Sequence, residues 1–150
     1  MVRRAALNDV VEIYGLIESF AEKRVMLHRP LSEIYDKLRD FFVYDDGGTV
    51  LGTCALQICS QEMGEIRSLT VRDGCTGKGI GRSLVNACLA DARAIGLKKV
   101  FALTYKTGFF HRLNFRTIDK NVLPHKIWSD CVKCDRFPSC DETAVVIDLE

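Results

Sequence analysis

A β-prone run followed by a glycine-rich turn decides the fold. The run reads Glu65-Ile66-Arg67-Ser68-Leu69-Thr70-Val71, and the turn reads Gly74-Cys75-Thr76-Gly77-Lys78-Gly79-Ile80-Gly81. A helix is then predicted over residues 79–95, with one apolar stripe formed by Ile80, Leu84, Cys88, Ala92 and Ile95. A glycine-rich turn between a strand and a helix N-terminus binds anions, because backbone N–H groups point outward and the helix dipole favours negative charge. The turn is therefore a candidate phosphate site.

Two familiar phosphate-binding patterns fit this turn poorly. A P-loop needs G-x-x-x-x-G-K-S/T, but Gly79 follows Lys78 here. A dinucleotide-binding turn needs G-x-G-x-x-G, whereas glycines 77, 79 and 81 are spaced G-x-G-x-G. Lys78 and Arg82 add positive charge, so an anion remains the expected ligand.

The strand before the turn breaks its own alternation. Ile66 is at an even position, but Leu69 and Val71 are at odd ones. A strand with one buried face keeps its parity, so the slip predicts a β-bulge near Arg67 or Ser68. A bulge splays the strand from its neighbour and leaves backbone groups to which an extended, amide-bearing ligand such as pantetheine can bind. The alternative is that Arg67 and Ser68 simply face solvent.

The remaining elements predict a mixed α/β sheet with helices on its faces, in one domain over residues 1–150. Strands are expected at 2–5, 41–44, 50–59, 99–104, 115–118 and 143–149, and further helices at 9–24, 32–38 and 107–113. Asp46-Gly47-Gly48 is a turn signal between the strands at 41–44 and 50–59, which predicts a hairpin. Asn8 or Asp9 is the expected cap of the first helix, and Ser32 of the second. Residues 119–142 are expected to be an irregular, cysteine-rich insertion before the last strand.

Composition excludes several classes of protein. The chain has 21 basic and 20 acidic residues, so no charge excess points to nucleic acid or a membrane surface. No apolar run approaches the about 20 residues of a membrane span, and the N-terminus lacks the apolar stretch of a signal peptide. We expect a cytoplasmic protein. The sequence is compatible with a homodimer but does not determine the oligomeric state.

The cysteines argue against a secreted disulfide framework, because their number, seven, is odd and no secretion signal accompanies them. The dispersed four are expected to be small buried side chains: Cys54, Cys59, Cys75 and Cys88. A second group is spaced H-x5-C-x2-C-x5-C and includes the ligand types of a structural zinc site: His125, Cys131, Cys134 and Cys140. A Cys131–Cys134 redox pair or packed thiols would give the same pattern.

At the strand and turn, the chain resembles the GCN5-related N-acetyltransferases (GNAT). Their signature is Q/R-x-x-G-x-G/A after a strand of the type E-I-x-x-L-x-V, and an opening R-x-A-x-x-x-D occurs at Arg3, Ala5 and Asp9. The resemblance implies a mostly antiparallel sheet splayed at its fourth strand, and acetyl-CoA as co-substrate. It implies cofactor contacts from Leu69, Thr70, Val71, Thr76, Gly77, Lys78, Gly79, Ile80, Gly81 and Arg82. Thr76 departs from the usual Gln or Arg, but its N–H and hydroxyl still suit a phosphate.

A narrower stretch, residues 101–115, is similar to bacterial N-acetylglutamate synthases, and residues 123–134 resemble their short single-domain form. Asn114 departs from the usual Gly before Phe115. This resemblance implies acetylation of an amino acid, L-glutamate, for arginine biosynthesis. A GNAT enzyme acting on another amine, such as a protein N-terminus, and a non-catalytic acyl-CoA sensor remain alternatives.

The resemblance also implies roles for single residues. Glu65 heads the splayed strand, the family's usual place for a general base, although it could be a surface glutamate. Phe110 stands where many members have a tyrosine that acts as the general acid, and phenylalanine cannot donate a proton. Tyr105 is therefore the substitute candidate for the general acid, although it could instead be a tyrosine of the core or of the rim of the site. An acceptor with two carboxylates needs cations. The candidates are Arg29 first and then Arg67, Lys106 and Lys126, each of which could instead be a solvated surface charge.

Overall fold

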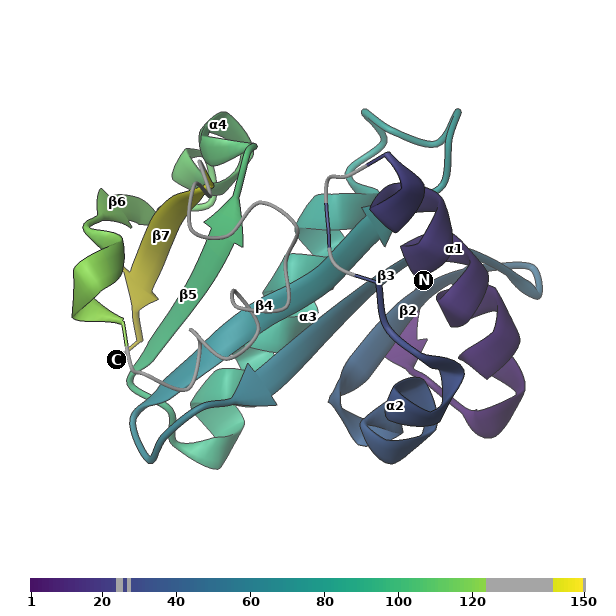
Figure 1. The fold of residues 1–150 in the computed structure, drawn as a ribbon, viewed down its shortest axis with the longest axis horizontal. Helices are drawn as coiled ribbons and strands as arrows, with labels where there is room; N and C mark the ends of the chain where they lie inside the picture. Colours follow the sequence, from purple (N-terminus) through teal and green to yellow (C-terminus); the bar gives the residue numbers. More distant parts are fainter. Residues whose placement is uncertain (24–25, 27, 124–141, 150) are drawn as a thin grey trace. The chain divides into compact units, whose positions relative to one another are not determined.

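The computed structural model describes residues 1–23, 26, 28–123 and 142–149 (Figure 1). The strands are β1 Val2–Arg4, β2 Phe41–Asp46, β3 Thr49–Ile58, β4 Met63–Val71, β5 Lys99–Thr104, β6 Arg116–Ile118 and β7 Thr143–Asp148. The helices are α1 Val10–Glu22, α2 Leu31–Asp36, α3 Ile80–Ile95 and α4 Thr107–His111. Single 3-10 turns cover Leu7–Asp9, Leu38–Asp40 and Lys120–Val122. The predicted mixed α/β fold is confirmed.

The strands follow the order β1-β2-β3-β4-β5-β7-β6. The pairs β1–β2, β2–β3, β5–β7 and β6–β7 are antiparallel, and the predicted hairpin turns at Gly47 and Gly48, whose φ values are +60° and +97°. The parallel β4–β5 ladder is short and ends at the pair Glu65–Phe101. The pairs of this ladder involve Met63, Gly64 and Glu65 of β4, all of which lie in the first part of the strand.

Contacts divide the chain into two compact units, and β4 contributes to both. Unit 1 comprises Met1–Gln57 and Ile66–Asp91, and unit 2 comprises Ile58–Glu65 and Ala92–Glu150. The single domain expected from length stays a prediction. In the part of the chain that the structure describes, no helix is long and apolar enough to cross a bilayer.

Helices cover both faces of the sheet in unit 1. On one face, α1 and α2 form a core with the strands, and its members include Ile13, Ile17, Ile34, Val43 and Ala55. On the other face, α3 packs so closely that a Cβ on Gly52 would lie 3.1 Å from Leu84 and 3.2 Å from Ile80. Cys54 and Cys88 also meet on this face, with their sulfurs 3.6 Å apart. The two faces alternate along β3, as the period of a strand requires.

The predicted irregularity of β4 lies at Ser68, whose φ is +53°. Before it, Arg67 lines a pocket together with Ile34 and Ala55, on the α1–α2 face. After it, Thr70 contacts Thr53 on the same face. An odd and an even position thus share one face, because the left-handed residue between them adds a half-step to the alternation.

Three local expectations are wrong. Ser32 does not cap α2; Pro30 is the N-cap and its carbonyl accepts from Glu33 N at 3.0 Å. Ile95 is 51 % exposed rather than part of the buried stripe of α3. Gly96, with φ +92°, ends the helix there and Leu97 packs in its place at 7 % exposure. Of the dispersed cysteines, Cys75 is only half-buried, because it lies in the exposed turn.

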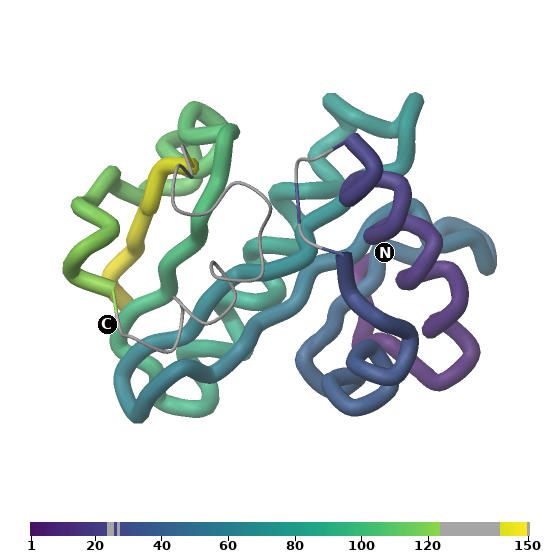
Figure 2. Tube along the Cα trace, in the orientation of Figure 1, coloured from purple at the N-terminus to yellow at the C-terminus, as the bar shows by residue number. Residues whose placement is uncertain are grey.

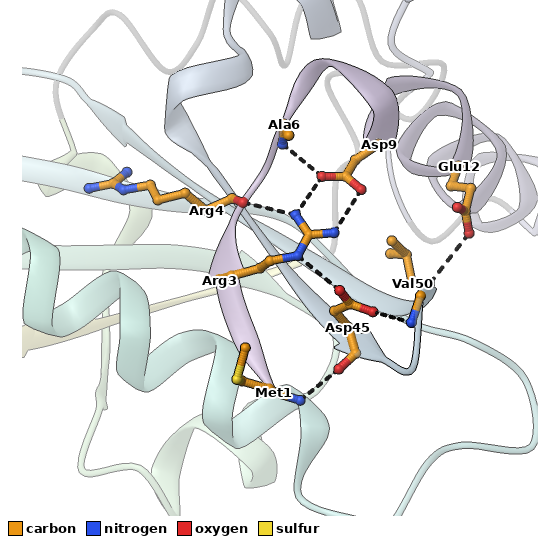
Figure 3. A network of polar contacts seen from close by, with 9 residues as sticks. Met1, Arg3, Arg4, Ala6, Asp9, Glu12, Asp45 and Val50 are labelled. Carbon is orange, nitrogen blue, oxygen red and sulfur yellow. Dashed lines mark hydrogen bonds and ion pairs between the residues drawn. The ribbon is translucent and has the colours of Figure 1, made fainter.

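A polar network ties the N-terminal strand to α1 and the hairpin (Figure 3). Arg3 donates to both carboxylate oxygens of Asp9 at 2.8 and 3.0 Å, and to Asp45 at 3.0 Å. Asp9 also accepts from Ala6 N at 2.7 Å. The R-x-A-x-x-x-D pattern is therefore a structural clamp at the start of α1.

Candidate active site

The glycine-rich turn lies between β4 and α3 (Figure 2). The end of β4, the turn and the start of α3 all belong to unit 1. Gly74, Gly77 and Gly79 have φ values of +83°, +79° and +79°. A Cβ on Gly77 or Gly79 would meet nothing within 4 Å. These glycines are thus required for the backbone conformation rather than for packing, and the space beside the turn is open to a ligand.

The turn presents backbone donors at the N-terminus of α3. Residues 76–79 are exposed, so their backbone N–H groups are accessible to a ligand. The helix begins where Ser83 donates from its N–H and hydroxyl to the carbonyl of Gly79, at 3.0 and 2.9 Å. Lys78 and Arg82 are exposed beside it. The turn therefore combines accessible backbone N–H groups, the N-terminus of a 16-residue helix and two cationic side chains. This combination fits the diphosphate of a coenzyme.

The other predicted cofactor contacts lie on β4 after Ser68. Thr70 is 1 % exposed, so its side chain faces the interior and only its backbone could meet a ligand. Leu69 and Val71 are half-buried, and so is Gly81. Ile80 is only 3 % exposed, so its side chain packs in the interior.

A pocket in unit 1 lies beside the irregularity of β4. Its lining is Arg29, Glu33, Ile34, Lys37, Asp40, Phe41, Ala55, Gln57, Arg67 and Ser68, around about 320 Å³ of space that includes its open side. The start of α2 supplies one wall and the strands β2, β3 and β4 supply the floor. Arg29 and Arg67, two of the predicted acceptor residues, are thus brought together.

Charged side chains share the lining of the pocket with the apolar residues Ile34, Phe41 and Ala55. The side chain of Arg29 is only 14 % exposed and pairs with Glu33 at 3.4 Å. Arg67 donates to the amide oxygen of Gln57. Burial raises the pKa of the Asp40 carboxyl, against the nearby charges of Lys37 and Arg67. Three cationic and two anionic side chains therefore share the lining.

Three further predicted residues lie in unit 2. Glu65 is half-buried at the last pair of the parallel ladder. Tyr105 is 39 % exposed, and Lys106 is exposed at the start of α4. Phe110 is buried at 3 % and packs edge-on against Phe115 with ring centroids 5.1 Å apart, so it is a core residue.

The remaining predicted residues lie outside the described part of the chain. They are Lys126 and the proposed zinc ligands His125, Cys131, Cys134 and Cys140. Within the described residues, no group of three or more His, Cys, Asp or Glu side chains is placed to hold a metal ion. The zinc site stays a prediction.

Sequence reasoning missed three of the five charged residues that line the pocket. Glu33 lies in α2, Asp40 lies in the following 3-10 turn and Lys37 lies between the two, in a segment whose spacing carries no motif. The hint was the cluster of charges between residues 33 and 40, which an ordinary solvent-facing helix would share.

Comparisons with known proteins agree with this geometry. Residues 7–115 match the acetyltransferase (GNAT) family. The chain is 41 % identical over 145 residues to an uncharacterized N-acetyltransferase, CT2212, of Chlorobaculum tepidum, covering 97 % of this chain and 94 % of the relative. It is 34 % identical over 133 residues to an amino-acid acetyltransferase of Mycobacterium tuberculosis, covering 87 % of this chain and 76 % of the relative.

A solved structure extends the likeness to the fold. The N-acetylglutamate synthase of Neisseria gonorrhoeae, complexed with coenzyme A and N-acetyl-glutamate, superposes with a TM-score of 0.91 at 26 % identity. The match covers 100 % of this chain and 35 % of that one. The family match spans the hairpin, the irregular strand, the glycine-rich turn and α3. The chain therefore belongs to the acetyltransferase (GNAT) family.

Proposed function

We propose that the protein transfers the acetyl group of acetyl-CoA to the α-amine of an amino acid, with L-glutamate as the first acceptor to test. The observation that carries the proposal is the pocket beside Ser68, in which Arg29, Lys37 and Arg67 face one small space. The name of the Mycobacterium relative and the ligands of the Neisseria structure support the same class of acceptor.

The charges of the pocket complement those of glutamate. Two carboxylates require cationic partners, and arginine offers paired donors to a carboxylate. Arg29 and Arg67 supply such forks, and Lys37 supplies a third positive charge. Glu33 and Asp40 suit the ammonium group of the same molecule. A polyamine would meet three positive charges here, which disfavours that acceptor.

The glycine-rich turn is the proposed seat of the coenzyme diphosphate. Its exposed N–H groups and the N-terminus of α3 favour an anion, and Lys78 and Arg82 lie next to them. The backbone of β4 after Ser68 is the proposed partner of the pantetheine amides, because the parallel ladder with β5 ends at Glu65.

The chemistry needs a neutral amine and a leaving thiolate. The amine nitrogen attacks the thioester carbonyl carbon, a C–N bond forms, the C–S bond breaks and the sulfur leaves with the electron pair. Glu65 is the proposed acceptor of the ammonium proton, directly or through water. A thiol has a pKa of about 8.5, so the thiolate of coenzyme A can leave without being protonated by an acid. Tyr105 is the candidate proton donor if an acid does take part.

A screen of the twenty amino acids for release of free CoA tests the proposal. We expect release with glutamate and little with arginine or lysine, whose side chains bring positive charge into the pocket. Release with no amino acid but with peptides would favour an enzyme acting on protein N-termini. Acetyl-CoA binding without turnover of any amine would favour an acyl-CoA sensor. Both outcomes contradict the proposed acceptor.

Calorimetry of Gly79→Asp tests the coenzyme site separately. The substitution adds a negative charge and a Cβ at φ +79°, in the space proposed for phosphate. We expect acetyl-CoA affinity to fall strongly in a folded variant. Ala90→Asp, which adds the same charge to an exposed position of α3, is the matched control. Equal affinities in the two variants would contradict the proposed site.

A further inference from the structure

Arg72, at the start of the glycine-rich turn, makes two backbone hydrogen bonds. Arg72 follows the last residue of β4, and its N–H donates to the carbonyl of Leu51 at 2.7 Å. Its own carbonyl accepts from Cys75 N at 3.0 Å, which closes the first bend of the turn. The backbone of Arg72 therefore links β3 to the turn.

The side chain of Arg72 adds a second set of links. Its Nε and Nη2 both donate to the carbonyl of Val50, at 3.2 and 2.9 Å. Its Nη2 also lies 3.6 Å from Oε2 of Glu12, on α1. The same Glu12 oxygen accepts from Val50 N at 3.4 Å, a contact drawn in Figure 3. Arg72, Val50 and Glu12 thus form a closed ring of contacts, all within unit 1.

The guanidinium of Arg72 is committed to these partners. Its side chain is 42 % exposed, so an ion pair with Glu12 alone would add little stability. Two hydrogen bonds to one backbone carbonyl are different, since they fix where the strand ends and the turn begins. Asp73, the next residue, lies 3.2 Å from Nζ of Lys23, which follows α1, but both side chains are exposed and this contact adds little.

We infer that Arg72 is a positioning residue for the coenzyme diphosphate: clamped to Val50 and Glu12, it holds the glycine-rich turn in its anion-binding conformation. The inference rests on the proposed role of the turn. Three glycines with positive φ make the turn adaptable, and an adaptable turn needs a fixed root if its N–H groups are to converge on one phosphate. No residue of this clamp needs to touch the coenzyme.

Arg72→Met tests the inference, because methionine keeps the stem and removes every donor. If the turn then spends about a tenth of its time in the binding conformation, the apparent Kd for acetyl-CoA rises about tenfold. Hydrogen exchange should quicken at Cys75 N, whose hydrogen bond to the carbonyl of Arg72 closes the first bend of the turn. Arg93→Met, at an exposed position in the last turn of α3, is the matched control and should change neither quantity.

A truncated donor separates positioning from general damage. Acetyl-pantetheine lacks the diphosphate-linked nucleotide, so its kcat/KM should be the same in Arg72→Met and the parent. An equal loss with both donors would overturn the inference, as would unchanged exchange in the turn with unchanged acetyl-CoA affinity. A third outcome for Arg72→Met would be slower binding of acetyl-CoA with a weaker salt dependence and unchanged hydrogen exchange. It would indicate that Arg72 contacts the phosphate directly, which also contradicts a positioning role.

Two further variants complete the test. Glu12→Gln keeps the acceptor for Val50 N but removes the charge, so it should weaken acetyl-CoA binding less than Arg72→Met and add nothing to it in the double variant. It also replaces Arg72→Met should that protein not fold. Gly79→Asp tests the turn itself. If Gly79→Asp leaves the ratio of activity with acetyl-CoA to activity with acetyl-pantetheine unchanged, the proposed coenzyme site is wrong. This outcome does not depend on the hydrogen-exchange result for Arg72→Met.

Discussion

The hydroxyl of Thr53 on β3 donates a 2.8 Å hydrogen bond to the carbonyl of Ser68, the β4 residue with φ +53°. Thr53 Oγ1 also lies 3.0 Å from Thr70 Oγ1. Because the single proton of Thr53 is used on the carbonyl, the Thr70 hydroxyl must donate to Thr53. Both threonines are buried, at 0 % and 1 % exposure. The irregularity of β4 is thus held by side chains from within the sheet.

Thr53→Val should destabilise the protein. The substitution keeps the shape but leaves the buried Thr70 hydroxyl and the Ser68 carbonyl without their partner, at a cost of about 1–3 kcal/mol in the free energy of unfolding. Urea denaturation measures this quantity. Thr53→Ser keeps the hydroxyl and is the control, with a smaller loss. Equal midpoints for Thr53→Val and the parent would show that the irregularity does not depend on this bond.

The sequence predicted the elements whose signal is local. The turn at Gly47 and Gly48 and the start of α3 after Gly79 are specified by backbone chemistry within a few residues. The parity slip of β4 was also local, because side-chain alternation is fixed by strand geometry. These predictions needed no knowledge of distant contacts, and the structure confirms them.

The pocket and the clamp were beyond local reasoning. Asp40 and Arg67 line one space although they are far apart in the chain, and no spacing rule joins them. Arg72 contacts Glu12, which lies on a helix much earlier in the chain. Such contacts follow from how strands pair and helices pack, and a single sequence carries no direct record of either.

Arg29→Ala should mainly raise the KM for glutamate. Losing charged hydrogen bonds to a carboxylate, worth about 1.5–3 kcal/mol, corresponds to an increase of roughly ten- to a hundredfold. The substitution also removes the partner that lies 3.4 Å from Glu33, which leaves a negative charge facing the acceptor. Initial rates at varied glutamate and fixed acetyl-CoA measure the effect.

Arg39→Ala, at an exposed position of the turn before β2, is the control for Arg29. It should leave both KM values unchanged. A fall in kcat of Arg29→Ala with an unaltered KM for glutamate would show that Arg29 does not hold the acceptor in the ground state.

Glu65→Gln should lower kcat at neutral pH and lose less activity as pH rises. The amide cannot take the ammonium proton, but more of the acceptor amine is already neutral at higher pH. A pH–rate profile of the variant against the parent measures this difference. Glu62→Gln, an exposed residue near the start of β4, is the control. A constant ratio of rates across the pH range would rule out Glu65 as the base.

Asp9→Asn should destabilise the protein at neutral pH, and the loss should vanish in acid. Arg3 lowers the pKa of the Asp9 carboxyl by hydrogen bonding, and the Ala6 N–H adds to this. A carboxyl with a depressed pKa in the folded state contributes stability that is complete above its unfolded value of about 3.9 and is lost as pH falls through the folded value. Asparagine keeps the acceptor for Ala6 but removes the charge that Arg3 needs.

We therefore expect the free energies of unfolding of parent and Asp9→Asn to differ by about 1–3 kcal/mol at pH 7 and to converge as pH falls through the lowered pKa of Asp9. Urea denaturation at a series of pH values gives this difference. Asp36→Asn, at an exposed position of α2, should match the parent throughout. Asp45, whose pKa Arg3 also lowers, remains in all three proteins. A gap that persists undiminished at pH 2.5 would show that Asp9 acts through packing rather than through its charge.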